Sequence, residues 1–112
     1  MTTYAIFFSY SSDAWARMIS APEDRTAAVR QVLGSLDGSL ECIYWMQGSF
    51  DGLIIADLPD SVSAAAASIA VRSSGAITTS QAHELLNQDQ LSQALQRAGR
   101  TVQAFRPPGR PA

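Results

Sequence analysis

Four side chains of this 112-residue chain are candidates for binding or chemistry: Arg25, Tyr44, Asp51 and His83. Asp51 follows a Gln-Gly-Ser turn and precedes Gly52, which has no side chain and lets a ligand or another backbone come close. Its carboxylate could bind a polar ligand or act as a base. It could instead accept hydrogen bonds from the amides of its own turn. We favour the second role.

His83 is the single histidine, and it lies in a segment with strand-like alternation. On one face of that strand we expect a partly polar row made of Ile77, Thr79, Gln81, His83 and Leu85. Such a row could line a cavity, although a lone histidine is more often a hydrogen-bonded packing residue. Joined by Asp51 or Glu84 it would still be a poor ligand set for zinc. We therefore expect no metal and no other cofactor.

Arg25 follows Glu23 and Asp24, a pattern typical of a helix start with an ion pair. The same guanidinium near a pocket mouth could bind an anion. Tyr44 belongs to a set of large aromatic residues that could form a pocket for a planar ligand or could anchor a core or an interface. That set is Tyr10, Trp15, Tyr44 and Trp45.

Composition excludes several classes of protein. The net charge is −2, and the eight basic residues are all arginines scattered along the chain, so no basic surface for nucleic acid or anionic lipid is predicted. Cys42 is the single cysteine, which rules out an internal disulfide. We find no membrane-length apolar run and no signal peptide, and we expect a cytoplasmic location. Nucleophile-elbow, phosphate-loop and dinucleotide motifs are absent from the sequence.

Hydrophobic periodicity predicts the elements that must position these side chains. We expect strands over 2–10, 39–46, 50–58 and 77–86. We expect helices from about residue 13, from Pro22 to Gly38, over 61–74, and from Asn87, with Gln90 completing a capping box at Asn87.

Three finer predictions concern helix faces and ends. Pro22 is expected at a first helical position. The 61–74 helix is expected to turn Val62, Ala65, Ala66 and Ile69 toward the sheet. A short edge strand is expected over 101–105, at the end of a single domain of residues 1–105, and 106–112 are expected to be a flexible tail.

The element order β-α-β-β-α-β, followed by a helix, predicts an α+β fold: a ferredoxin-like antiparallel sheet with helices on one face. In the first strand Ile6 and Phe8 would lie on one face, and Ala5 and Phe7 on the other. Because both faces are apolar, helices on one face leave the other to be covered. We therefore expect a homodimer, or a higher homo-oligomer, that packs sheet against sheet.

One segment is similar to the signature of a known family. Gly48-Ser49-Phe50-Asp51 resembles the Gly-x-Tyr-Asp motif of the GYD-domain proteins, small bacterial proteins, with phenylalanine in the place of tyrosine. Flanking similarities are Pro22-Glu23-Asp24-Arg25, Tyr44, Pro59-Asp60 and Gly75, so that the resemblance spans about residues 3–96. It implies a ferredoxin-like fold of the dimeric α/β-barrel type and no agreed activity.

Three functions remain open at this point. The chain could be a small-ligand-binding or regulatory domain, with a pocket between helices and sheet or between stacked sheets. It could be a cofactor-independent enzyme, such as a monooxygenase or an isomerase, by analogy with dimeric α/β barrels. It could also be an assembly protein whose function is its interface.

Overall fold

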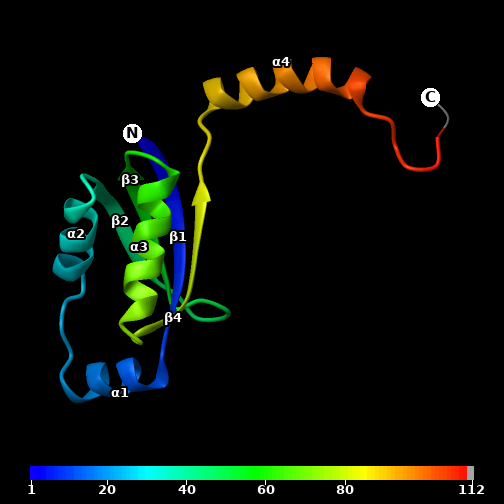
Figure 1. Ribbon diagram of the computed structural model, residues 1–112. Coiled ribbons are helices and arrows are strands. Elements are labelled where there is room, and N and C mark those ends of the chain that lie inside the picture. Colours follow the sequence, from blue (N-terminus) through cyan, green and yellow to red (C-terminus); the bar gives the residue numbers. More distant parts are fainter. Residues whose placement is uncertain (111–112) are drawn as a thin grey trace.

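A computed structural model of the chain describes residues 1–110, which form a four-stranded antiparallel sheet and four helices (Figure 1). The elements are β1 (Thr2–Tyr10), α1 (Ser12–Ser20), α2 (Thr26–Ser35), β2 (Ser39–Trp45), β3 (Gly52–Leu58), α3 (Ser61–Ser73), β4 (Ile77–Glu84) and α4 (Gln88–Ala104). This confirms the predicted α+β class. The strand order is β2-β3-β1-β4, which places β4 at an edge. Residues 111–112 of the predicted flexible tail lie outside the described residues.

Strand β1 lies inside the sheet and has two apolar faces, as its sequence predicts. Tyr4, Ile6 and Phe8 are buried on the face covered by α2 and α3. The buried core on that face is made of Tyr4, Ile6, Leu33, Ala56, Leu58 and Ala64. Ala5 and Phe7 alternate with these residues and point to the opposite face, which no helix of residues 1–110 covers.

The β2–β3 connection carries the signature motif and brings β3 against the ring of Phe8. Gly48 has a φ of 121°, which favours glycine, and the Met46 amide donates to the Asp51 carbonyl at 2.9 Å. A Cβ on Gly52 would lie 2.2 Å from Cζ of Phe8. The first residue of β3 therefore has to be glycine while the Phe8 ring keeps its place in the core.

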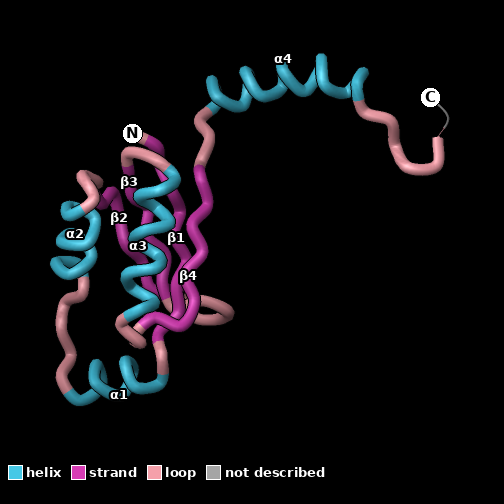
Figure 2. The backbone as a smooth tube through the Cα atoms, viewed as in Figure 1, coloured by secondary structure: helices cyan, strands magenta, loops and turns pink. Residues whose placement is uncertain are grey.

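The helix that we predicted to begin at Pro22 begins at Thr26 instead, so the predicted start of this helix was wrong. Residues 22–25 carry no regular structure, because the chain has to run from α1, at one end of the sheet, to α2, which lies over the sheet (Figure 2). Asp24 Oδ1 accepts a hydrogen bond from the Thr26 amide at 2.9 Å, and this bond lowers the pKa of Asp24.

Helix α3 turns a different face to the sheet from the one we predicted. Ala64 and Ala67 are buried, whereas Val62 and Ile69 are 74% and 61% exposed. The helix has small alanines on more than one side, and the side with the smallest residues permits the closest approach to the strands. Its start was predicted correctly: Asp60 accepts from the Ser63 amide at 2.8 Å, which lowers the pKa of Asp60.

Helix α4 leaves the sheet and stands clear of the rest of the molecule (Figure 1). Its predicted capping box between Asn87 and Gln90 is present. The edge strand predicted over 101–105 is wrong: residues 101–104 continue the helix, and the Phe105 amide donates to the Thr101 carbonyl at 3.2 Å. At that distance from β4 an extended segment would have no strand to pair with, whereas a helix satisfies its own backbone.

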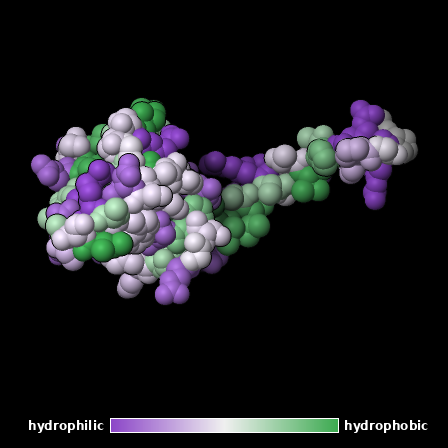
Figure 3. Space-filling view, turned by 90° about the horizontal axis from the view of Figure 1, so that it is seen from below, coloured by the Kyte–Doolittle hydropathy of each residue, from purple (hydrophilic) through white to green (hydrophobic). Residues whose placement is uncertain are grey.

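The apolar stripe of α4 is exposed rather than packed. None of its residues is buried, and Val102 and the following Phe105 are 70% and 64% exposed. Figure 3 shows hydrophobic surface along the segment that joins α4 to the rest of the molecule. No helix within residues 1–110 combines the length and apolar character needed to cross a bilayer.

Candidate functional site

A cavity of about 330 Å³ lies between the helices and the sheet. Its walls come from β1, β3, β4, α2, α3, the segment before α2 and the turn before β4. The apolar side chains that line it are Ile6, Phe8, Ala28, Val29, Val32, Leu33, Ile54, Ala67, Ala70, Val71, Ala76 and Ile77. A largely apolar hollow of this size, with a few polar groups at its wall, is the usual form of a small-molecule site.

The serine hydroxyls in the cavity wall are already paired with other protein groups. Ser68 and Ser80 share a hydrogen bond at 2.9 Å across the α3–β4 contact. Ser74 donates to the Val71 carbonyl at 2.6 Å and accepts from the Ala76 amide at 3.1 Å. These hydroxyls complete the wall without requiring a ligand.

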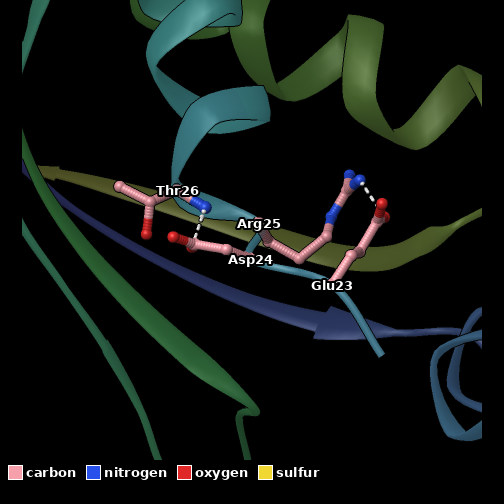
Figure 4. Close-up of polar contacts among 4 residues, drawn as sticks. All are labelled: Glu23, Asp24, Arg25 and Thr26. Atoms are coloured by element: carbon pink, nitrogen blue, oxygen red, sulfur yellow. Dashed lines mark hydrogen bonds and ion pairs between the residues drawn. The ribbon is translucent and has the colours of Figure 1, made fainter. Parts of the chain in front are cut away.

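Arg25 is the single charged residue that lines the cavity within residues 1–110. Its Nη1 donates to Oε1 of Glu23 at 2.8 Å, and its side chain is 37% exposed (Figure 4). The hydrogen bond to Glu23 raises the pKa of Arg25. A guanidinium has five N–H donors, so one contact to Glu23 leaves it able to bind a further anionic or carbonyl oxygen.

Tyr10 lies in the cavity wall beside Arg25 and belongs to an aromatic cluster. The ring of Tyr10 packs edge-on against Phe8 and Trp15, with centroids 5.5 and 5.2 Å apart, and lies 6.0 Å from Trp45. Burial raises the pKa of the Tyr10 hydroxyl, and the neighbouring Arg25 opposes that rise. The phenol is therefore neutral at physiological pH, and its packed ring holds it in place.

Asp51 is held at the end of β1 by contacts with the protein. Its Oδ2 accepts from the Tyr10 amide at 2.9 Å and from the Trp15 indole at 3.3 Å, and its own amide donates to the Phe8 carbonyl. The carboxylate thus joins the signature loop to β1 and α1. These partners differ from the turn amides that we expected from the sequence.

Replacing Asp51 with alanine is expected to lower the free energy of unfolding by about 1–3 kcal/mol, because a hydrogen-bonded, partly buried carboxylate is removed. Chemical denaturation followed by tryptophan fluorescence measures the change. Asp13→Ala, in the first turn of the neighbouring α1, is the control and should cost less. An Asp51→Ala variant as stable as the parent would contradict this structural role.

His83 and Tyr44 lie on the opposite face of the sheet. His83 pairs with Ala5, and Tyr44 with Leu53 at the other side of the sheet. The His83 ring packs edge-on against Phe7, with centroids 5.7 Å apart, and Tyr44 is 64% exposed. The fold therefore brings Arg25 and Asp51 to the Tyr10 end of the cavity and separates them from the other two candidates.

The polar row predicted around His83 is also shorter than expected. A register shift between Ser9 and Tyr10 pairs Tyr10 with Ile77, and Ile77 lines the cavity instead of the face that holds His83. Within residues 1–110 no three His, Cys, Asp or Glu side chains gather closely enough to hold a metal ion.

Sequence reasoning did not find most of the cavity wall. Residues such as Val32, Ala67 and Val71 have the composition and spacing of ordinary helix core positions. Tyr10 and Arg25 were singled out, but for separate reasons, and only folding places them side by side. No sequence signal distinguishes an apolar side chain that lines a hollow from one that fills a core.

The comparison with protein families agrees with the resemblance seen in the signature loop. The model of the GYD domain matches residues 4–95, which is most of the chain. This chain belongs to the GYD domain family. No match was found among curated proteins or among solved structures. Within this GYD domain the signature residues Gly48 to Asp51 form the loop that fastens β3 to the end of β1.

Proposed function

We propose that this GYD domain binds a small apolar molecule in the cavity between α2, α3 and the sheet, and that it acts as a homodimer. The observation that carries the first part is the 330 Å³ cavity with its apolar wall and its single charged residue. At about 30 Å³ for a group the size of a water molecule, the cavity holds roughly ten non-hydrogen atoms. That is the size of a small metabolite.

The wall chemistry favours binding over catalysis. Within residues 1–110 the lining offers Arg25, a neutral Tyr10 and serines that are hydrogen-bonded within the protein. Proton transfer at neutral pH would need a group whose pKa lies near 7. His83, the single histidine and the residue type most often used for such a step, lies on the other face of the sheet. A ligand-binding or regulatory role therefore fits this cavity better than a monooxygenase or isomerase activity.

The uncovered face of the sheet supports the dimer. We call it the open face: it carries Ala5, Phe7, Cys42, Tyr44, Leu53, Ile55 and His83, with Phe50 packed on Phe7 at a centroid distance of 5.4 Å. The strand order β2-β3-β1-β4, with helices in both crossovers, supports a ferredoxin-like arrangement. Pairing two such sheets through their open faces gives a dimer of the α/β-barrel type.

The area of the open face alone favours a dimer in which α4 also packs on the second copy. Four strands spaced by about 4.8 Å, each about 25 Å long, give an open face of roughly 500 Å² per chain. Two such faces bury roughly 1,000 Å² in total, the lower bound for a stable interface. The exposed stripe of α4, formed by Leu91, Leu95 and Val102, adds apolar area when it packs on the second copy. We therefore place both surfaces in one interface.

The ligand site is tested by filling the cavity. Ala28 lines the cavity, whereas its neighbour Ala27 is exposed and does not, so the two residues give a matched pair on α2. Ala28→Phe is expected to weaken binding of octanamide at least tenfold, and Ala27→Phe to leave it unchanged. Calorimetry gives the affinities, and amide chemical shifts of Ala67 and Val71 show where the probe binds.

Two results would remove this function. One is an unmodified chain that binds octanamide nowhere or shifts only signals outside the cavity. The other is an Ala28→Phe variant that binds as well as the parent. Either result would leave assembly through the interface as the better account of the domain.

A further inference from the structure

We propose that the ligand of the cavity is an amphiphile with an apolar body and a single negative charge, such as a medium-chain carboxylate, and that Arg25 binds its anionic end. This inference rests on the proposed function and adds the chemical class of the ligand.

The inference rests on which polar groups of the cavity wall already have hydrogen-bond partners within the protein. Ser68, Ser74 and Ser80 are paired with protein groups, so they do not require polar atoms in a ligand. Arg25 differs, because its bond to Glu23 uses Nη1 and its contact with the Tyr10 hydroxyl leaves further N–H groups of the guanidinium for a ligand. The other guanidinium N–H groups can donate hydrogen bonds to the oxygens of a carboxylate, whose geometry matches their planar fork.

The position of Arg25 at one end of the cavity determines how a ligand would be oriented. Arg25 lies in the segment between α1 and α2. It lines both the cavity and a smaller hollow beside α1, so its charge lies at the end of the cavity that adjoins this hollow. The cavity extends from there along Val29, Val32 and Ile6 into the helix–sheet core. A molecule that places its charge at Arg25 therefore buries its apolar body among these side chains.

Nearby acidic groups limit the charge that the site tolerates. Glu23 is 2.8 Å from Arg25, and Asp51 acts on Tyr10 from the same end of the cavity. Both carboxylates repel a multiply charged anion such as a phosphate monoester. Arg17 lines the adjoining hollow together with Glu23 and Arg25. The two arginines thus offset the two carboxylates, which leaves the site able to take a single negative charge but not several. The neutral Tyr10 hydroxyl can donate a further hydrogen bond to it.

The test compares octanoate with octanamide, which have the same shape and the same number of non-hydrogen atoms and differ in charge. The unmodified chain is expected to bind octanoate about tenfold more tightly than octanamide, since a partly exposed arginine contributes about one such factor. Arg25→Gln should abolish this preference, because it weakens the binding of octanoate more than that of octanamide. Arg30→Gln, an exposed arginine on α2 outside the cavity wall, is the matched control.

The outcomes separate the two proposals. If octanamide binds in the cavity but octanoate binds no better, or if Arg25→Gln keeps the preference, the anionic ligand is wrong and the apolar site stands. If neither compound binds, the proposed function itself fails. Octyl phosphate is a third probe: binding tighter than that of octanoate would overturn the preference for a single charge.

Discussion

Replacing Ile55 with arginine is expected to convert the proposed dimer into a monomer. Ile55 pairs with Ala5 on β1 and with Cys42 on β2, so it lies within the open face. A guanidinium there would be buried against apolar side chains of a second copy without a partner, which costs several kcal/mol. At 1.4 kcal/mol for each factor of ten, we expect the dissociation constant to rise at least a hundredfold.

Light scattering at micromolar concentration measures this change, from twice the chain mass of 12.0 kDa to the chain mass itself. Val62→Arg is the matched control, because Val62 is a large exposed apolar residue on the outer side of α3. Unchanged mass in the Ile55→Arg variant, or a monomeric parent, would overturn the proposed interface.

Leu95→Glu tests the part that α4 plays in the same interface. Leu95 is an exposed member of the α4 stripe, and its replacement should raise the dimer dissociation constant without affecting the fold of the body. A variant that dimerises as tightly as the parent would show that the open face suffices and that α4 packs elsewhere.

The second large effect is expected at Gly52. A Cβ there would lie 2.2 Å from Cζ of Phe8 and within 2.8 Å of two further ring atoms. Phe8 cannot move freely, because its ring packs edge-on against Tyr10 and Trp45. Gly52→Ala is therefore expected to lower the free energy of unfolding by about 1–3 kcal/mol, the usual cost of overpacking a core.

Gly34→Ala provides the matched comparison for Gly52→Ala. Gly34 lies within α2, and nothing lies within 4 Å of a Cβ added there. The same substitution should stabilise the protein by up to about 1 kcal/mol, because alanine favours a helix more than glycine does. Thermal unfolding that moves in the same direction for both variants would contradict the crowding inferred at Phe8.

The cavity explains why the signature loop matters to the site. Asp51 fixes the end of β1 through the Tyr10 amide, and Tyr10 presents its ring to the cavity beside Arg25. The Phe50 side chain points instead to the open face, where it packs on Phe7. The two ends of the motif thus support the two parts of the proposed function, one on each face of the sheet.

The sequence alone determined the α+β class of this GYD domain and most of its elements. The strand alternation of residues 2–10, the cap at Asp60 and the capping box at Asn87 are set by contacts between residues close in the chain, and the structure contains all three. Membership of the family followed from the signature, because a short loop motif is also local.

Only the tertiary structure decided the site. Helix α3 carries alanines on more than one side, and the close approach of the helix to the strands selects the side of Ala64 and Ala67. The shift at Ser9 turns Ile77 into the cavity, and the path from α1 to α2 brings Arg25 beside Tyr10. These placements depend on how whole elements pack, and periodicity along the chain carries no information about a hollow between them.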